Sequence, residues 1–146
     1  ACGCGEVDRT TEFETGMRFH ERHVARQQWE PDPLILDDQA LVVHANGRGL
    51  VMLTGCGHAG VVNITRHAMR LTGVERVCAV MGGFDLSGPA FEPVIEPTVA
   101  ALHELAPELV VPAHCTWKAQ HRLATTLGDA FVPNAVGTTY TLAAAA

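Results

Sequence analysis

The chain has 146 residues, of which 47% are hydrophobic, and its formal net charge at pH 7 is −6. This length and apolar content are enough for one folded domain with a buried core, and they exclude a disordered chain. The acidic balance argues against nucleic acid as a partner, because phosphate binding needs a basic face. No apolar run approaches the roughly 20 residues of a membrane span, so no membrane association is expected.

Residues 1–36 are polar and carry no clear periodic pattern. We treat them as a poorly defined N-terminal segment, with a strand expected only near Phe13. A half-domain follows at residues 37–142. It opens with an apolar strand at 40–45, and Asn46-Gly47 is a strong signal for the hairpin turn that leads into a second strand at 50–53. Residues 143–146 are four alanines, which we assign to a tag or tail.

Three helices are expected to alternate with short apolar strands in the rest of the chain. Apolar residues spaced three or four apart predict helices, and continuous apolar runs predict buried strands. Helices followed by buried strands indicate an α/β fold with a mixed sheet flanked by helices. The expected helices are 60–72, 94–106 and 117–127, and the expected strands are 77–81, 109–112, 131–132 and 138–142.

A polar side chain that can bind a metal follows each of three apolar strands. His58 follows the strand at 50–53, Asp85 follows the strand at 77–81, and His114 follows the strand at 109–112. Ligands of open α/β sheets gather at the carboxyl ends of the strands, so the three side chains are expected to converge. Two histidines and a carboxylate are a known ligand set for catalytic zinc or iron.

Each of these residues also has an ordinary structural explanation. His58 lies close to a helix start and could hydrogen-bond there. Asp85 could accept hydrogen bonds from loop amides, which is a common role for Asp in turns. His114 could make a structural contact at a strand end. All three residues occupy the same kind of position, just after an apolar strand, and this agreement favours the metal site.

A second metal site could use thiols, because Cys56 and Cys115 flank the two histidines. Cys56, His58, His114 and Cys115 would give a zinc site with two sulfur and two nitrogen ligands. Side chains of consecutive residues in an extended chain point to opposite sides, so His114 and Cys115 should diverge, and this set ranks lower. A redox role for the two thiols ranks lower still, since neither lies in a C-x-x-C motif.

The cysteine count and spacing bear on the cellular location. The chain has five cysteines, so they cannot all pair with one another, and their spacing matches no zinc finger. A reducing cytoplasm is therefore the expected location. Among the acidic residues, Glu12 and Glu14 could act as acid or base, but nothing in the sequence distinguishes them.

Together these motifs resemble the metallo-β-lactamase-fold hydrolases. The similarity is greatest to the branch of 7,8-dihydropterin-6-methyl-4-(β-D-ribofuranosyl)aminobenzene-5′-phosphate synthase, and it extends upstream to residues 11–14 and 33–41. The motifs that carry it are LTGCGHAGVVNI at 53–64, GGFDL at 82–86 and VPAHCT at 111–116.

The resemblance implies an αβ/βα sandwich of two similar halves, with a dinuclear metal site at one edge between them. It also implies that His58, Asp85 and His114 are metal ligands, although this branch often has His where this chain has Asp85. Zinc, manganese or iron would be the metal. The substrate would be a small-molecule ester or phosphoester.

The family's first metal motif, His-x-His-x-Asp-His, is absent from the sequence. The chain therefore resembles only the C-terminal half of the fold, and at most one ion per chain is expected. Such a half leaves one sheet face bare, which predicts a homo-oligomer or a separate N-terminal half as partner. We expect part of a metal-dependent hydrolase that is inactive or weakly active alone. The alternative is a non-catalytic oligomeric α/β module with a vestigial metal site.

Overall fold

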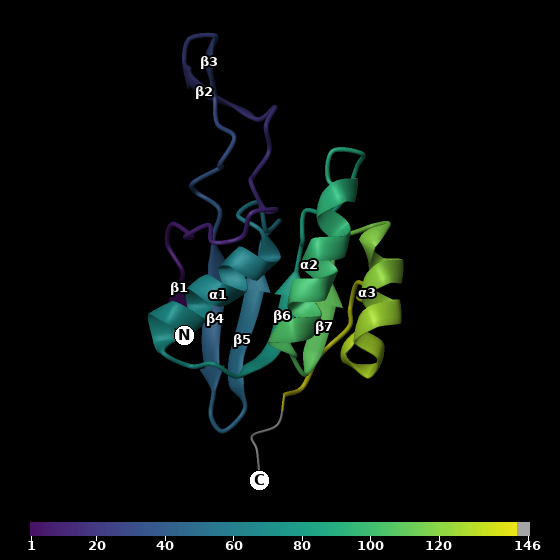
Figure 1. The fold of residues 1–146 in the computed structure, drawn as a ribbon. Coiled ribbons are helices and arrows are strands. Elements are labelled where there is room, and N and C mark those ends of the chain that lie inside the picture. The colour runs from purple at the N-terminus through teal and green to yellow at the C-terminus, as the bar shows by residue number, and fades with distance from the viewer. Residues whose placement is uncertain (143–146) are drawn as a thin grey trace.

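A computed structural model describes residues 1–142 of the chain. Its main feature is a five-stranded mixed sheet with the strand order β1-β4-β5-β6-β7. β4 and β5 form the predicted antiparallel hairpin, whereas β5, β6 and β7 run parallel (Figure 1). The strands are β1 (Cys2–Gly3), β4 (Ala40–Ala45), β5 (Gly49–Thr54), β6 (Val77–Gly82) and β7 (Leu109–Pro112).

Three α-helices pack on one face of this sheet (Figure 1). Each follows one of the parallel strands, as the alternating pattern predicted. The helices are α1 (Val61–Thr72), α2 (Glu92–Leu105) and α3 (Ala119–Leu127), and a 3₁₀ turn, η1 (Gly128–Ala130), follows α3. The sheet and its three helices confirm the predicted α/β class. Within residues 1–142, no helix is long and apolar enough to cross a membrane.

The main core lies between the helices and the sheet. Because side chains alternate along a strand, Leu50 and Met52 of β5 point toward the helices and are completely buried. Val51 lies on the opposite face of the sheet, in a small second cluster with Cys78 and Ala79. The two faces are therefore unequal, and the second one has far less apolar packing.

Two glycines bound helix α1 where the sequence predicted its limits. Gly73 ends the helix in the left-handed conformation, with φ of 67°. Gly60 precedes the helix with φ of 93°, and a Cβ at this position would lie 2.3 Å from a carboxylate oxygen of Glu14. Only glycine therefore allows the segment around Glu14 to pack against the start of α1.

A two-stranded hairpin rises away from the sheet near the carboxyl ends of the parallel strands (Figure 1). It consists of β2 (Glu21–Ala25) and β3 (Gln28–Pro31). All of β2 is exposed, and the His23 and Trp29 rings meet edge to face at 5.1 Å. The sequence pattern did not predict this hairpin.

Three expected strands are not found. The segment around Phe13 forms no strand, because its backbone turns to bring Glu14 to helix α1. Phe131 makes a single bridge to Val110, and the residues after it, through 142, form no strand. A few apolar and β-branched residues suggested these strands, but such a segment can also pack without pairing. The expected tail at 143–146 lies outside the described residues.

Candidate metal centre at the carboxyl edge of the sheet

The loops after β5, β6 and β7 are joined by backbone hydrogen bonds. The N–H of Gly83 donates to the carbonyl of Gly55 at 2.9 Å, and the N–H of Ala113 donates to the carbonyl of Gly82 at 2.7 Å. The Thr54 hydroxyl adds a bond to the carbonyl of Gly83 at 2.8 Å. Polar side chains in these loops are therefore held close together at one edge of the sheet.

This close approach depends on Gly82, which precedes the Asp85 loop. Its φ is 122°, and a Cβ there would lie 2.3 Å from the carbonyl oxygen of Thr54. A side chain at this position would separate β5 from β6. The glycines before Asp85 thus allow the tight turn that the sequence suggested.

His58 lies next to a buried carboxylate. Its Nδ1 is 3.6 Å from Oδ1 of Asp38, whose other oxygen accepts the N–H of Ala59 at 2.9 Å. The Arg9 guanidinium donates to the carbonyl of His58 at 3.2 Å. Both the ring and the backbone of His58 are therefore held by residues from the N-terminal part of the chain.

Asp85 belongs to the same charged cluster. Burial raises the pKa of the Asp85 carboxyl, the nearby His58 opposes this effect, and Asp38 adds to it. The Asp85 backbone has φ of 49°, in the left-handed region that Asp tolerates better than most residues. His58 and Asp38 thus both lie close enough to act on the Asp85 carboxyl.

His58 and Asp85 also line a cavity of about 630 Å³. Most of its wall is apolar and aromatic, with Phe13, Phe84 and Phe91 among the lining residues. Arg18 lines the cavity as well, at the base of the β2–β3 hairpin. An apolar pocket with a few charged groups is the usual form of a small-molecule site.

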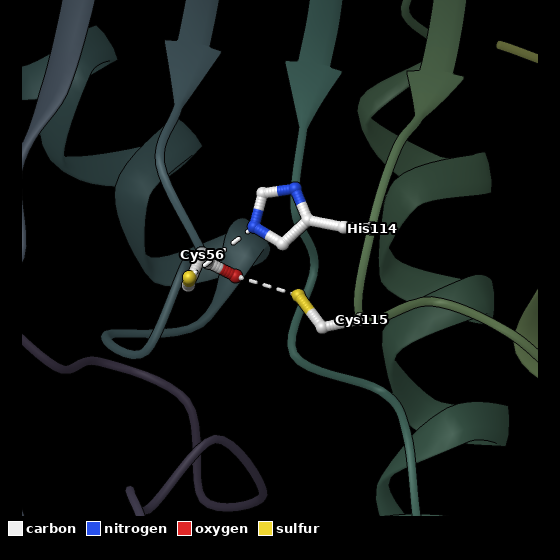
Figure 2. A group of neighbouring side chains, drawn as sticks. All are labelled: Cys56, His114 and Cys115. Carbon is white, nitrogen blue, oxygen red and sulfur yellow. Dashed lines mark hydrogen bonds between the residues drawn. The ribbon is translucent and has the colours of Figure 1, made fainter. Parts of the chain in front are cut away.

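His114 is exposed and contacts a cysteine from the neighbouring loop. Its Nε2 lies 3.2 Å from Sγ of Cys56, while the thiol of Cys115 donates to the carbonyl of Cys56 at 3.4 Å (Figure 2). Among residues 1–142, these three form the one group of metal-binding side chains whose ligand atoms all lie within 4.8 Å of one another.

Comparison with known proteins identifies the fold of this chain. No family model matches the chain. A solved structure of a metal-dependent hydrolase of the β-lactamase superfamily superposes with a TM-score of 0.72 at 27% identity, over 94% of this chain. The chain has the metallo-β-lactamase fold. The resemblance found in the sequence is thereby confirmed.

A curated relative agrees with the structural match over part of the chain. It is the 7,8-dihydropterin-6-methyl-4-(β-D-ribofuranosyl)-aminobenzene-5′-phosphate synthase of Methanocaldococcus jannaschii, which is 30% identical over 81 residues. The match covers 56% of this chain and 27% of that protein. The superposition covers 56% of the solved chain. The metallo-β-lactamase-fold segment thus spans about half of one relative and about a quarter of the other.

The three predicted ligands of this metallo-β-lactamase-fold chain lie in loops at the same edge of the sheet. His58 and Asp85 share the cavity, and His114 follows β7 in the adjacent loop. Their ligand atoms do not form a single group within 4.8 Å. The ligand set His58, Asp85 and His114 therefore stays a prediction.

Three of the four residues of the lower-ranked thiol set, Cys56, His114 and Cys115, lie together in the structure. Its low rank assumed an extended backbone, in which His114 and Cys115 point to opposite sides. Cys115 instead has φ of 52°, so the chain turns there and its thiol reaches the Cys56 loop.

Sequence reasoning missed the residues that hold the site in place. Asp38 and Arg9 lie far from His58 in sequence, and neither belongs to a motif that indicates contact. Glu14, whose sequence signal was weak, is buried against the start of α1. For Glu14 and Asp38 the available signal was the similarity of residues 11–14 and 33–41 to one family branch, and Arg9 lies outside both ranges.

Proposed function

We propose that this chain is part of a metal-dependent hydrolase, with His58, Asp85 and His114 as metal ligands. The observation that carries the proposal is the superposition on a metal-dependent hydrolase over 94% of the chain. The carboxyl ends of β5, β6 and β7, where ligands of α/β sheets gather, supply all three residues.

The chemistry of the donor set fits a divalent ion such as zinc, manganese or iron. Two imidazoles and a carboxylate suit these metals. Asp38 beside His58 resembles the outer carboxylates that orient histidine ligands. With three protein ligands, at most one ion per chain is proposed. When bound, the ion would supply Lewis acidity and favour water deprotonation near neutral pH.

The chain's own residues would bind and orient the substrate. The apolar wall formed by Phe13, Phe84 and Phe91 would hold the organic part of a small ester or phosphoester and exclude water. Arg18 would attract a negative group. The Methanocaldococcus jannaschii relative is named for a (β-D-ribofuranosyl)aminobenzene 5′-phosphate, a compound with an aromatic ring and a phosphate group, which supports a substrate with both features.

The chain by itself is proposed to have little or no hydrolase activity. The sequence contains no His-x-His-x-Asp-His motif, so the donors of a second ion are missing from these 146 residues. A two-metal site stabilises both the attacking and the leaving oxygen, and one weakly held ion cannot do this. Residues from another segment or another chain would complete the site.

The test combines the metal content of the purified chain with two substitutions. His58→Ala and Asp85→Asn should each lower bound manganese, which the thiols of the chain bind poorly, by about tenfold or more at limiting metal. His103→Ala changes an exposed histidine on α2 and serves as the matched control. Hydrolysis of p-nitrophenyl phosphate and p-nitrophenyl acetate by the wild-type chain should stay near the rate without protein.

Two outcomes would change this proposal. Robust metal-dependent hydrolysis by the chain alone would show that the site needs no further ligands. Unchanged metal content in both variants would remove His58 and Asp85 from the ligand set. The second outcome would favour the alternative, a non-catalytic oligomeric module with a vestigial metal site.

A further inference from the structure

Cys56, His114 and Cys115 make a cluster that the proposed hydrolytic ligands use only in part. The cluster joins the loops after β5 and β7, which are far apart in sequence (Figure 2). Its atoms are two sulfurs and one imidazole nitrogen. This donor set suits a thiophilic ion better than the oxygen-seeking ions magnesium or calcium.

The distances within the cluster suit a tetrahedral zinc site. The Nε2 of His114 lies 3.2 Å from Sγ of Cys56, and all three ligand atoms lie within 4.8 Å of one another. With Zn–S bonds of about 2.3 Å and Zn–N bonds of about 2.0 Å, tetrahedral ligands lie about 3.5–3.8 Å apart. Small rotations of the side chains would therefore bring the three ligand atoms to the separations of a tetrahedral zinc site.

The backbone around the cluster keeps both thiols in place. The N–H of Leu86 donates to the carbonyl of Cys115 at 2.7 Å, which fixes the turn after β7. Gly83 packs against both cysteines, and a Cβ there would lie 2.9 Å from Sγ of Cys115 and 2.9 Å from Cα of Cys56. The absence of a side chain at Gly83 is thus what permits the two thiols to approach.

We propose that Cys56 Sγ, Cys115 Sγ and His114 Nε2 bind one zinc ion. Both thiols lose their protons to solvent on binding, so two thiolates and a neutral imidazole balance the charge of Zn²⁺. His114 is exposed and the two cysteines are partly buried, so the ion can enter from solvent. Three protein ligands leave the fourth position open to water or to a ligand.

This site does not require hydrolase activity. It shares His114 with the proposed hydrolytic ligands, so one chain holds its single ion at one of the two ligand sets and not at both. The two proposals therefore need variants that separate them. Cys56→Ser and Cys115→Ser remove thiol ligands and leave His58, Asp85 and His114 intact. His58→Ala and Asp85→Asn each remove a hydrolytic ligand and leave Cys56, His114 and Cys115 intact.

The test is a titration of the reduced, metal-free chain with Co²⁺, followed by competition with Zn²⁺. A thiolate-to-cobalt charge-transfer band should grow to one equivalent and should be displaced by zinc. Cys56→Ser and Cys115→Ser should each weaken the band and lower zinc affinity by at least about tenfold. Cys2→Ser alters an exposed thiol and is the matched control, expected to behave as wild type.

Alkylation provides a second measurement that needs no folded variant. In the wild-type chain, zinc should slow modification of Cys56 and Cys115 by iodoacetamide, while exposed Cys2 should react at an unchanged rate. The absence of a charge-transfer band, or of zinc protection at both cysteines, would overturn the proposal. A band that persists in Cys56→Ser/Cys115→Ser would do the same.

Comparison of the two variant pairs distinguishes failure of this site from failure of the hydrolytic one. Under the present proposal, the band survives in His58→Ala and in Asp85→Asn. If those variants lose all metal while both cysteine variants keep it, the ion belongs to the hydrolytic ligand set, and the thiol site is wrong.

Discussion

At the start of α1, Glu14 takes the place of the capping side chain that Gly60 cannot supply. Its carboxylate oxygens accept the N–H groups of Val62 at 2.9 Å and Asn63 at 2.8 Å. These are donors that a helix N-terminus otherwise leaves unpaired. Burial nevertheless raises the pKa of Glu14 to about 7, although both hydrogen bonds act in the opposite direction. A group that holds two segments together is thus sensitive to pH.

The raised pKa of Glu14 predicts a fall in stability as the pH increases. Between the unfolded value of 4.5 and the folded value of about 7, the folded chain binds more protons than the unfolded chain. The free energy of unfolding should therefore decline across this window, by about 3 kcal/mol, and then level off above it with respect to this group. Urea denaturation at a series of pH values measures the decline.

Glu14→Gln removes the ionisation and should abolish this part of the decline. Glu12→Gln, at an exposed position nearby, is the matched control and should retain it. An equal decline in wild type and Glu14→Gln between pH 4.5 and 7 would show that Glu14 is not its source.

At the scale of elements, Asn63 attaches the N-terminal segment to α1. Its Oδ1 accepts the N–H groups of Thr10 at 2.8 Å and Thr11 at 2.9 Å. Its Nδ2 donates to the carbonyls of Glu14 and Ala59. The side chain is completely buried and uses all four of its polar positions. The segment that presents Glu14 to the helix is thus held by the side chain of Asn63, whose own backbone N–H donates to the Glu14 carboxylate.

Asn63→Ala should destabilise the chain by about 2–4 kcal/mol. The substitution removes the four hydrogen bonds of the Asn63 side chain, and each such bond contributes about 0.5–1.5 kcal/mol. Thermal unfolding measures the loss, and the exposed Asn134→Ala is the control. Hydrogen exchange adds a local readout, since the amides of Thr10 and Thr11 should lose protection. Unchanged exchange at these two amides would contradict this role of Asn63.

At the scale of the molecule, the helices cover only one face of the sheet (Figure 1). On the other face, Leu41 and Leu53 pair across β4 and β5 and are 43% and 40% exposed. Met81 lies beside Leu53 in the next strand. Apolar side chains in adjacent strands thus form a continuous surface, and such surfaces mark interaction sites.

This surface predicts that the purified chain forms a dimer at micromolar concentration. A second copy is the partner available in a pure solution, and a two-fold axis would place the same apolar surface against itself. Light scattering coupled to gel filtration should give about twice the 15.6 kDa chain mass. Leu41→Lys/Leu53→Lys should shift the chain toward monomer, because each lysine would bury a charge in the interface.

Leu71→Lys provides the control for this experiment. Leu71 is 57% exposed on α1, on the helical side of the sheet, so the substitution should leave the mass unchanged. A wild-type chain that remains monomeric at these concentrations would contradict the predicted self-association.

The sequence by itself determined the βα order, the hairpin at Asn46-Gly47 and the bounds of α1, because short-range periodicity and turn chemistry specify these features. It also determined that His58, Asp85 and His114 follow successive parallel strands. Three of the expected strands were wrong, since strand formation needs a pairing partner that local sequence does not reveal.

Only the tertiary structure decided which side chains meet at the carboxyl edge. The left-handed backbone at Cys115 turns its thiol toward Cys56, a consequence of how the loops pack. Asp38 and Arg9 reach His58 across long separations in the chain. Local patterns can place a residue at the end of a strand. Contacts between distant segments depend on the summed packing of the whole fold, which no short stretch of sequence encodes.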